Sequence, residues 1–271
     1  VFDISDSFSS RYGNTMGKIN WKHRFTKNVT SDLSIFYSDY QFGLNLNTLS
    51  FNWDSGIASY GLKYGWQHYI SKDVQLNYGI EATYYDFNPG ILIPNSSEST
   101  VNYRELDRKY ALEPSAYIDV NQKIGDHLEI RYGLRYSTFY RYGQQEVNIY
   151  ENSPVEYNPV YNIYQEGTPI GTKFYGSGEV ISSFNNLEPR AALSYILNDE
   201  SSIKASYNRM AQYLHIVSNS QSPTPVNIWT PSGPFIQPQI LDQYALGYFR
   251  NFNNNRYSLE TEAFYKNISN R

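Results

Sequence analysis

The sequence predicts an all-β fold, and more specifically a transmembrane antiparallel β-barrel. Three observations predict it: long segments alternate apolar and polar residues, every second connection is long, and tyrosine is frequent. The chain has 271 residues, of which 17% are aromatic, with 28 Tyr, 14 Phe and 4 Trp. Because a membrane barrel alternates lipid-facing apolar residues with lumen-facing polar ones, its mean hydropathy, here -0.58, can equal that of a soluble protein.

The alternation has period two and is clearest from residue 128 onward. Leu128, Ile130, Tyr132, Leu134 and Tyr136 occupy the even positions, whereas the odd positions 129–137 hold Glu, Arg, Gly, Arg and Ser. A helix would not separate the two sets in this way, because its side chains repeat every 3.6 residues. The segment therefore predicts a strand with one apolar and one polar face.

The same pattern predicts ten strands. In chain order they cover residues 14–25, 31–42, 57–70, 74–84, 105–121, 128–137, 187–197, 201–211, 239–251 and 256–266. All of them reach ten residues or more, whereas strands of soluble proteins average about 5–6 and a tilted strand needs about 9–11 to cross a bilayer. Strand length therefore favours a membrane barrel over a soluble β-sandwich.

The connections between these strands alternate in length. Long loops are predicted at about 43–56, 87–104, 142–186 and 212–238, with short turns between them. Outer-membrane barrels have tight periplasmic turns on one rim and long extracellular loops on the other. In that orientation the first strand descends and the last one ascends, so we expect residues 1–271 to be part of a larger barrel wall.

Composition excludes several other classes. The formal net charge is -4, with 22 basic and 26 acidic residues. The sequence has no cluster of basic residues of the kind that binds nucleic acid. The chain has no cysteine, which excludes disulfides, a thiolate zinc site and a cysteine nucleophile. Its four histidines, His23, His68, His127 and His215, share no metal-ligand spacing. We therefore expect no metal, no cofactor, no catalytic residue and no enzyme activity.

The last third of the chain resembles the barrel of TonB-dependent outer-membrane receptors, particularly the Bacteroidetes type. The matching segments are Asn186–Tyr195, Ser202–Ile216, Ile228–Ser232, Ile236–Gln239, Asp242–Phe249 and Glu260–Lys266. The resemblance implies a 22-stranded barrel in the outer membrane of a Gram-negative cell, plugged by an N-terminal domain. It also implies import of a nutrient such as a siderophore, a glycan or a peptide, driven through TonB.

The resemblance further implies a set of partners. These are outer-membrane lipid, the plug domain and remaining strands, and the TonB complex, which would be reached through an N-terminal part. This sequence contains neither a plug domain nor a TonB box. A surface lipoprotein or another outer-membrane subunit is a further candidate partner.

Candidate ligand-binding residues lie in the two longest loops, since loops on a rigid barrel carry recognition. These aromatic and histidine side chains suit stacking on sugars, peptides or aromatic siderophores, although packing of the loops against one another would need the same residues. They are Tyr150, Tyr157, Tyr161, Tyr164, Tyr213, His215, Trp229 and Phe235.

A second group of candidates occupies the polar phase of the strands. These charged residues are expected to face the lumen, where pairing with a plug is one role and direct ligand contact is another. They are Glu81, Glu129, Arg131, Arg135, Glu188, Arg190 and Lys204.

Two other functions remain open from the sequence. One is a self-contained ten-stranded porin or outer-membrane protease, which would pair its first and last strands. The other is a receptor homologue that serves as a structural subunit or adhesin in a surface complex.

Overall fold

The computed structural model describes residues 8–46, 50–97, 99, 101–218 and 227–270. Ten long strands form one sheet, and their bounds follow. They are β1 (Phe8–Arg24), β2 (Val29–Leu46), β3 (Phe51–Tyr69), β4 (Val74–Pro94), β6 (Lys109–Ile124), β7 (Leu128–Tyr142), β12 (Val180–Asn198), β13 (Ser201–Gln212), β16 (Gln239–Phe252) and β17 (Tyr257–Ser269). Each overlaps one of the ten predicted strands, so the predicted all-β fold is confirmed.

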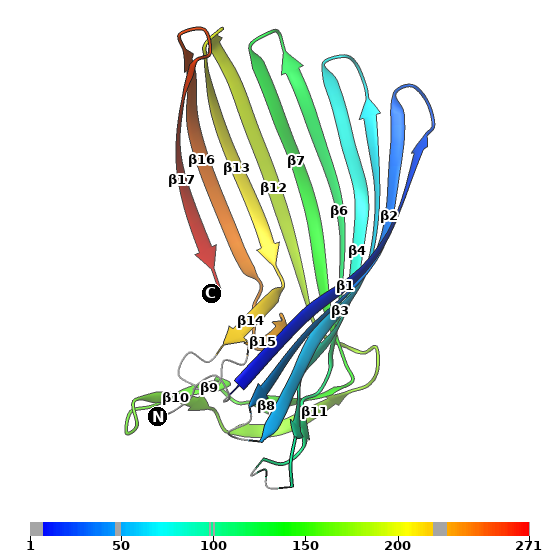
Figure 1. Cartoon of the computed structure of the whole chain (residues 1–271), viewed down its shortest axis with the longest axis vertical. Coiled ribbons are helices and arrows are strands. Elements are labelled where there is room, and N and C mark those ends of the chain that lie inside the picture. The colour runs from blue at the N-terminus through cyan, green and yellow to red at the C-terminus, as the bar shows by residue number, and fades with distance from the viewer. Residues whose placement is uncertain (1–7, 47–49, 98, 100, 219–226, 271) are drawn as a thin grey trace.

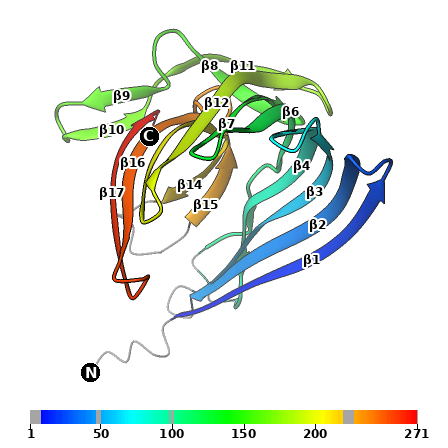
Figure 2. The same ribbon diagram turned by 90° about the horizontal axis from the view of Figure 1, so that it is seen from above.

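The strands follow one another in chain order, β1-β2-β3-β4-β6-β7-β12-β13-β16-β17, and every neighbouring pair is antiparallel. Figure 1 shows the sheet as a curved wall, and Figure 2 shows its arc from above. Among the described residues β1 and β17 form opposite edges and do not pair with each other. The self-closed ten-stranded barrel is therefore not the arrangement observed.

Short turns join the strands at one end of the wall. Two of them use left-handed backbone: Gly125 has φ 62°, and Asn253, Asn254 and Asn255 have φ of 53°, 53° and 64°. Glycine and asparagine adopt this conformation at low steric cost. The residues at these turns thus explain why the chain reverses so tightly there.

The other end carries the long connections, which hold further short strands, and among these only Glu105 of β5 falls in a segment that alternation predicts as strand. They are β5 (Arg104–Glu105), β8 (Gln145–Tyr150), β9 (Val155–Asn158), β10 (Ile163–Glu166), β11 (Pro169–Tyr175), β14 (Leu214–Ser218) and β15 (Asn227–Pro231). The pairs β8–β11, β9–β10 and β14–β15 form small separate sheets. The predicted loops 142–186 and 212–238 thus contain small sheets of their own.

The main strands also extend further than predicted. In the region predicted as loop 43–56, β2 reaches Leu46 and β3 begins at Phe51, and residues 47–49 lie outside the described residues. The predicted strand 105–121 is divided, since β5 pairs separately with β4 and β6 begins only at Lys109. Residues 219–226 of the predicted loop 212–238 also lie outside the described residues.

The two faces of the wall differ in chemistry. The β14–β15 hairpin lies inside the curve of the sheet (Figure 2). At its base, Tyr213 contacts Ser137 and Phe139 of β7. These two residues belong to the polar phase of β7, as Arg135 does. The polar phase therefore faces the concave side. The opposite phase, which includes Tyr132, Leu134 and Tyr136, is exposed on the convex side.

Tyrosine rings form a row on the convex face towards the long-loop end, and we call it the outer tyrosine row. Ring centroids are 5.0 Å apart for Tyr37–Tyr60, 6.3 Å for Tyr60–Tyr84 and 6.5 Å for Tyr84–Tyr110, and the far side of the arc holds a further pair, Tyr207–Tyr244, at 4.9 Å. Aromatic girdles of this kind mark the interface between lipid and water in membrane barrels. No helix among the described residues is long and apolar enough to cross a membrane.

Candidate functional site

The concave face carries an ion-pair cluster centred on Arg135 of β7. Its Nη1 lies 3.2 Å from Glu81, its Nη2 lies 3.5 Å from Glu113 and its Nε lies 3.9 Å from Glu188. Lys63 pairs with the same Glu81, and Ser137 donates a hydrogen bond to Glu188. Five adjacent strands supply these residues, so the ion pairs connect neighbouring strands across the wall. Three carboxylates face two cations, which makes the net charge of the cluster negative.

A second ion pair on the concave face, between Arg190 and Asp119, spans the three strands β6, β7 and β12. Arg190 of β12 donates from Nε to Asp119 Oδ1 at 2.6 Å and from Nη2 to Oδ2 at 2.5 Å. Gly133 of β7 lies between them in register, and a Cβ there would lie 2.8 Å from Asp119 Cγ and closer still to Oδ1. Glycine in the polar phase thus leaves room for the bidentate contact across the middle strand.

The β14–β15 hairpin is fixed to the wall by buried polar contacts. Tyr213, 2% exposed, stacks on Phe139 with ring centroids 4.8 Å apart, and its hydroxyl lies 2.7 Å from Ser137 Oγ and 2.8 Å from Asn186 Nδ2. His215 Nε2 lies 2.8 Å from Ser232 Oγ, and burial lowers the pKa of this imidazole. Tyr213 and His215 therefore lie in the packing of the hairpin and not on an accessible loop surface.

Between this hairpin and the β8–β11 sheet lies a hollow of about 330 Å³, which we call the loop hollow. Lys109 and Arg141 line it, and neither forms an ion pair with a carboxylate among the described residues. Lys109 Nζ donates to Thr230 Oγ1 at 2.8 Å, and Arg141 donates to the carbonyls of Tyr110 and Tyr142. Glu146 and Glu166 line the hollow as well, so the two cations and two carboxylates of the lining balance in charge, and an anionic group would have to compete with these carboxylates for Lys109 and Arg141.

Lys109 is the first residue of β6 and lies beyond Tyr110 of the outer tyrosine row, on its long-loop side. Burial, together with the charge of Arg141, lowers its pKa to about 8. The side chain is therefore mostly protonated at neutral pH. An anionic ligand would favour the charged form further.

Aromatic side chains also line the loop hollow. The ring of Tyr150 meets Phe235 edge to face at 5.6 Å, and the Tyr150 hydroxyl donates to Glu166 at 2.5 Å. This hydrogen bond is the main reason why the pKa of Tyr150 is raised above its ordinary value. Trp229 packs against the buried cluster of Phe87, Phe139 and Tyr213 and is half-buried.

The remaining loop candidates are not brought to this place. Tyr157 and Tyr164 lie on the β9–β10 arm with ring centroids 5.2 Å apart, and Tyr161 at its turn is 72% exposed. Figure 1 shows this arm as a separate projection at the long-loop end. Its aromatic residues are available to a partner outside the barrel wall.

The candidate lumen residues fall into two groups. Glu81, Arg135, Glu188 and Arg190 belong to the ion pairs described above. Glu129, Arg131 and Lys204 instead border a hollow nearer the short-turn end, and Lys204 lies 4.5 Å from the Phe249 ring centroid. Within the described part of the chain Glu129 and Arg131 have no ion pair, and both side chains are exposed.

Sequence reasoning missed Lys109 and Arg141. Both lie in the polar phases of their strands, Lys109 at 105–121 and Arg141 six residues beyond Arg135. Continuing the alternation outward would have placed both on the concave face, but their proximity depends on the antiparallel pairing of β6 with β7.

A curved antiparallel wall, with a polar concave face and long loops folded into the curve, is the architecture of outer-membrane β-barrel proteins. The family model "TonB dependent receptor-like, beta-barrel" matches residues 2–271. The chain therefore belongs to the TonB-dependent receptor β-barrel family, a family of outer-membrane receptors and transporters. This agrees with the prediction that the chain is not an enzyme, whereas the Bacteroidetes type stays a prediction.

Solved structures share this fold at low sequence identity. The ferric-catecholate import receptor Fiu of E. coli K12 matches with TM-score 0.58 and 12% identity, over 97% of this chain and 42% of that one. The iron transporter FrpB of Neisseria meningitidis matches with TM-score 0.60 and 12% identity, over 94% and 36%. The hemophore receptor HasR of Serratia marcescens matches with TM-score 0.62 and 10% identity, over 99% and 41%.

The chain thus spans about two fifths of the length of these structures. A comparison with curated proteins finds no match.

Proposed function

We propose that this chain forms part of the wall of a Gram-negative outer-membrane receptor that binds a nutrient and imports it with energy supplied through TonB. The observation that carries the proposal is the family match over residues 2–271, on a sheet whose ten long strands end in two edges that, among the described residues, do not pair with each other. Further strands and a plug domain would complete the barrel. The structural relatives include ferric-catecholate, iron and hemophore receptors, which makes an iron-containing nutrient one class to test.

Within this receptor the loop hollow is the proposed nutrient contact. Lys109 and Arg141 supply positive charge, and Tyr150 and Phe235 supply aromatic surface. The β14–β15 hairpin, with Trp229, holds one wall of the hollow in place. Glu129, Arg131 and Lys204, further down the concave face, are proposed to face the plug domain, since they are accessible there.

The experiment measures nutrient uptake by cells that carry the full-length receptor. We would compare wild type, a strain lacking the receptor and a strain lacking TonB, and supply ferric siderophores, haem, copper, glycans or peptides as the limiting nutrient. The expected result is that uptake of one nutrient is lost in both deletion strains. If the receptor is present in the outer membrane but its deletion changes none of these uptakes, the import function is refuted.

The nutrient found in this way allows a test of the loop hollow. Lys109→Met removes the charge and keeps most of the aliphatic stem, and Tyr161→Phe on the exposed β9–β10 arm is the control. We expect Lys109→Met to raise the half-saturating concentration for uptake about tenfold, because a charge-assisted contact contributes about 1.5 kcal/mol. Equal uptake by both variants would remove the loop hollow from the binding site.

The β9–β10 arm favours a second role, that of a docking element for a surface lipoprotein or another outer-membrane subunit. Val160, Tyr161 and Tyr164 are 81%, 72% and 75% exposed, more apolar surface than a short hairpin needs for its own stability. Deleting residues 155–166 should release a co-purifying subunit while the barrel stays folded. An unchanged subunit composition would exclude this role.

A further inference from the structure

The loop hollow holds charges of both signs, and they come from different parts of the fold. Lys109 and Arg141 belong to β6 and β7 of the wall, whereas Glu146 lies on β8 and Glu166 on β10, in the small sheets at the long-loop end (Figure 1). The wall therefore supplies the positive charge of the hollow, and the long loop supplies the negative charge.

These opposite charges do not pair with one another. No ion pair among the described residues includes Lys109, Glu146 or Glu166. Glu146 accepts a hydrogen bond from Thr172, and Glu166 accepts one from Tyr150 at 2.5 Å. Both carboxylates are thus held in place by neutral donors, and their negative charge is not compensated by a cation.

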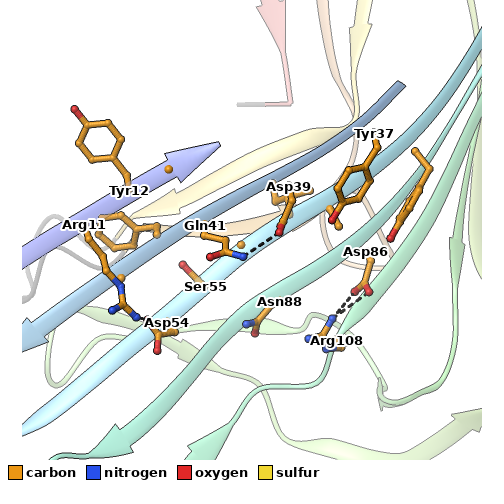
Figure 3. A pocket seen from close by; sticks show the side chains of 17 residues that line it. Arg11, Tyr12, Tyr37, Asp39, Gln41, Asp54, Ser55, Asp86, Asn88 and Arg108 are labelled. Atoms are coloured by element: carbon orange, nitrogen blue, oxygen red, sulfur yellow. Dashed lines mark hydrogen bonds and ion pairs between the residues drawn. The ribbon is translucent and has the colours of Figure 1, made fainter. Parts of the chain in front are cut away.

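A hollow on the convex face shows the contrast. It has a volume of about 710 Å³ and lies beside the outer tyrosine row, towards the long-loop end, and we call it the outer hollow. There Arg11 pairs with Asp54 at 2.8 Å, and Arg108 contacts both oxygens of Asp86 at 3.1 and 3.0 Å (Figure 3). Both guanidinium groups of the outer hollow find a carboxylate within it. In the described part of the loop hollow, the ammonium group of Lys109 finds none, although two carboxylates line the same hollow.

A ligand can reach the unpaired charges of the loop hollow. Glu146 and Glu166 are exposed, and Lys109 is partly exposed. The Lys109 ammonium uses one of its three N–H groups for Thr230, so two remain for an acceptor. Arg141 is 3% exposed and donates to backbone carbonyls, so it adds positive charge behind the lining without touching a ligand.

An aromatic surface lies beside these charges. Tyr150 is half-buried, Phe235 is 51% exposed, and the lining also includes Pro231, Pro234 and Ile236. The volume of the hollow, about 330 Å³, is at the small end of the range of ligand sites, roughly 300–1,000 Å³. The loop hollow thus suits a small molecule with an apolar side chain, of the size of a short peptide.

Other classes of ligand would leave some of these charges without a partner. An anion would face two accessible carboxylates against one accessible ammonium group, and a cation would be repelled by Lys109. A neutral glycan would leave charges of both signs unpaired, which is unfavourable because binding removes water from them. A molecule with both an ammonium and a carboxylate group complements the two parts of the lining at once.

We propose that the loop hollow binds a zwitterionic peptide of two or three residues. The peptide carboxylate contacts the Lys109 ammonium, the peptide ammonium contacts Glu146 and Glu166, and an apolar side chain packs on Tyr150 and Phe235. Charge-assisted hydrogen bonds at both ends fix the direction in which the peptide lies. This substrate class rests on the receptor function proposed above.

The experiment measures binding of the tripeptide Ala-Phe-Ala to the full-length receptor in detergent by isothermal titration calorimetry. The N-acetylated tripeptide lacks the ammonium group, and the tripeptide amide lacks the carboxylate. Lys109→Met removes the cation, and the double variant Glu146→Gln, Glu166→Gln removes both negative charges and keeps their hydrogen-bond acceptors. The matched control is Glu156→Gln, which removes an exposed carboxylate of the β9–β10 arm that does not line the hollow.

We expect wild type to bind Ala-Phe-Ala about tenfold more tightly than either modified peptide, since each modification removes one charge-assisted contact. Lys109→Met should bind Ala-Phe-Ala and its amide equally well. The double glutamine variant should bind Ala-Phe-Ala and the acetylated peptide equally well, and Glu156→Gln should keep both preferences.

Several results would overturn the zwitterion site. They are the absence of Ala-Phe-Ala binding to wild type in the millimolar range, an affinity that either modification leaves unchanged, and the persistence of both wild-type preferences in Lys109→Met and in the double variant. The two modified peptides test the site on wild type alone, so the result does not depend on the folding of any variant.

Failure of the zwitterion site can be told apart from failure of the proposed function. A receptor that imports a nutrient through TonB but does not select Ala-Phe-Ala over its modified forms refutes the peptide class alone. A receptor that selects Ala-Phe-Ala as expected, but whose deletion changes no uptake, refutes the import function and leaves the binding site standing.

Discussion

Replacing Gly133 with alanine should break the contact between Asp119 and Arg190. The new Cβ would lie 2.6 Å from the Ile118 carbonyl oxygen and 2.8 Å from Asp119 Cγ, so the carboxylate has to leave its place. Asp119 is 3% exposed and accepts two charge-assisted hydrogen bonds from Arg190. A hydrogen bond to a charged group contributes about 1.5 kcal/mol or more.

The size of the effect depends on solvent screening. The Arg190 side chain is 37% exposed, which reduces the worth of its charge. We therefore expect Gly133→Ala to lower the free energy of unfolding by about 2 kcal/mol. Gly17→Ala on β1 is the control, because its Cβ meets no atom within 4 Å and alanine restricts the unfolded chain. That control should be neutral or slightly stabilising.

The assay is urea unfolding of the full-length receptor in detergent micelles, with Gly133→Ala measured both alone and together with Asp119→Ala. If the carboxylate is the cause, the glycine substitution should cost at least about 1 kcal/mol less in the Asp119→Ala background. The reasoning is refuted if Gly133→Ala is as mild as Gly17→Ala. It is equally refuted if the cost is the same in both backgrounds, since the backbone of Ile118 would then be the obstacle.

Three further predictions concern the hairpin and the ion-pair cluster. Tyr213→Phe keeps the ring stack but leaves Asn186 without its hydroxyl partner, so the hairpin should be cleaved faster by protease, whereas Tyr161→Phe, at an exposed position, should change nothing. Burial lowers the pKa of His215, so the stability of the hairpin is complete above the ordinary histidine pKa of about 6.5 and falls as the pH drops below it. Cleavage of the hairpin by protease should therefore become faster between pH 7.5 and 5. The His215→Gln variant should not show this increase. Arg135→Met leaves Lys63 as the one cation in the cluster beside Glu81, Glu113 and Glu188. It should therefore lower the free energy of unfolding, measured in urea, by about 3 kcal/mol. Arg131→Met removes no ion pair and should lower it by less than about 0.5 kcal/mol.

The strands and their two faces could be predicted because period-two alternation is a local property. Glu81, Arg135 and Glu188 share the polar phase in the sequence, and the register of the sheet brings them together. The strands within loops could not be predicted in the same way. They depend on tertiary contacts such as that of Tyr213 with Phe139, which packs β14–β15 into the curve of the wall.

The two hollows were hidden from the sequence for different reasons. The loop hollow needs Thr230 beside Lys109, two residues 121 positions apart whose contact follows from the folded hairpin. The outer hollow depends on charges such as Asp39 and Asp86, which lie in the apolar phase and look like interruptions of the pattern. Such interruptions become informative once the outer tyrosine row shows at which depth they lie.

The most direct test of the receptor-wall assignment is the environment of single residues along β7. The chain has no cysteine, so Leu134→Cys on the convex face and Arg131→Cys on the concave face can each carry one fluorophore in the full-length receptor, reconstituted in bilayers. Brominated acyl chains should quench the label at residue 134 strongly and the label at 131 weakly, whereas a water-soluble quencher should show the reverse order. Equal quenching at both positions by either reagent would contradict a wall with lipid on one face and an aqueous lumen on the other.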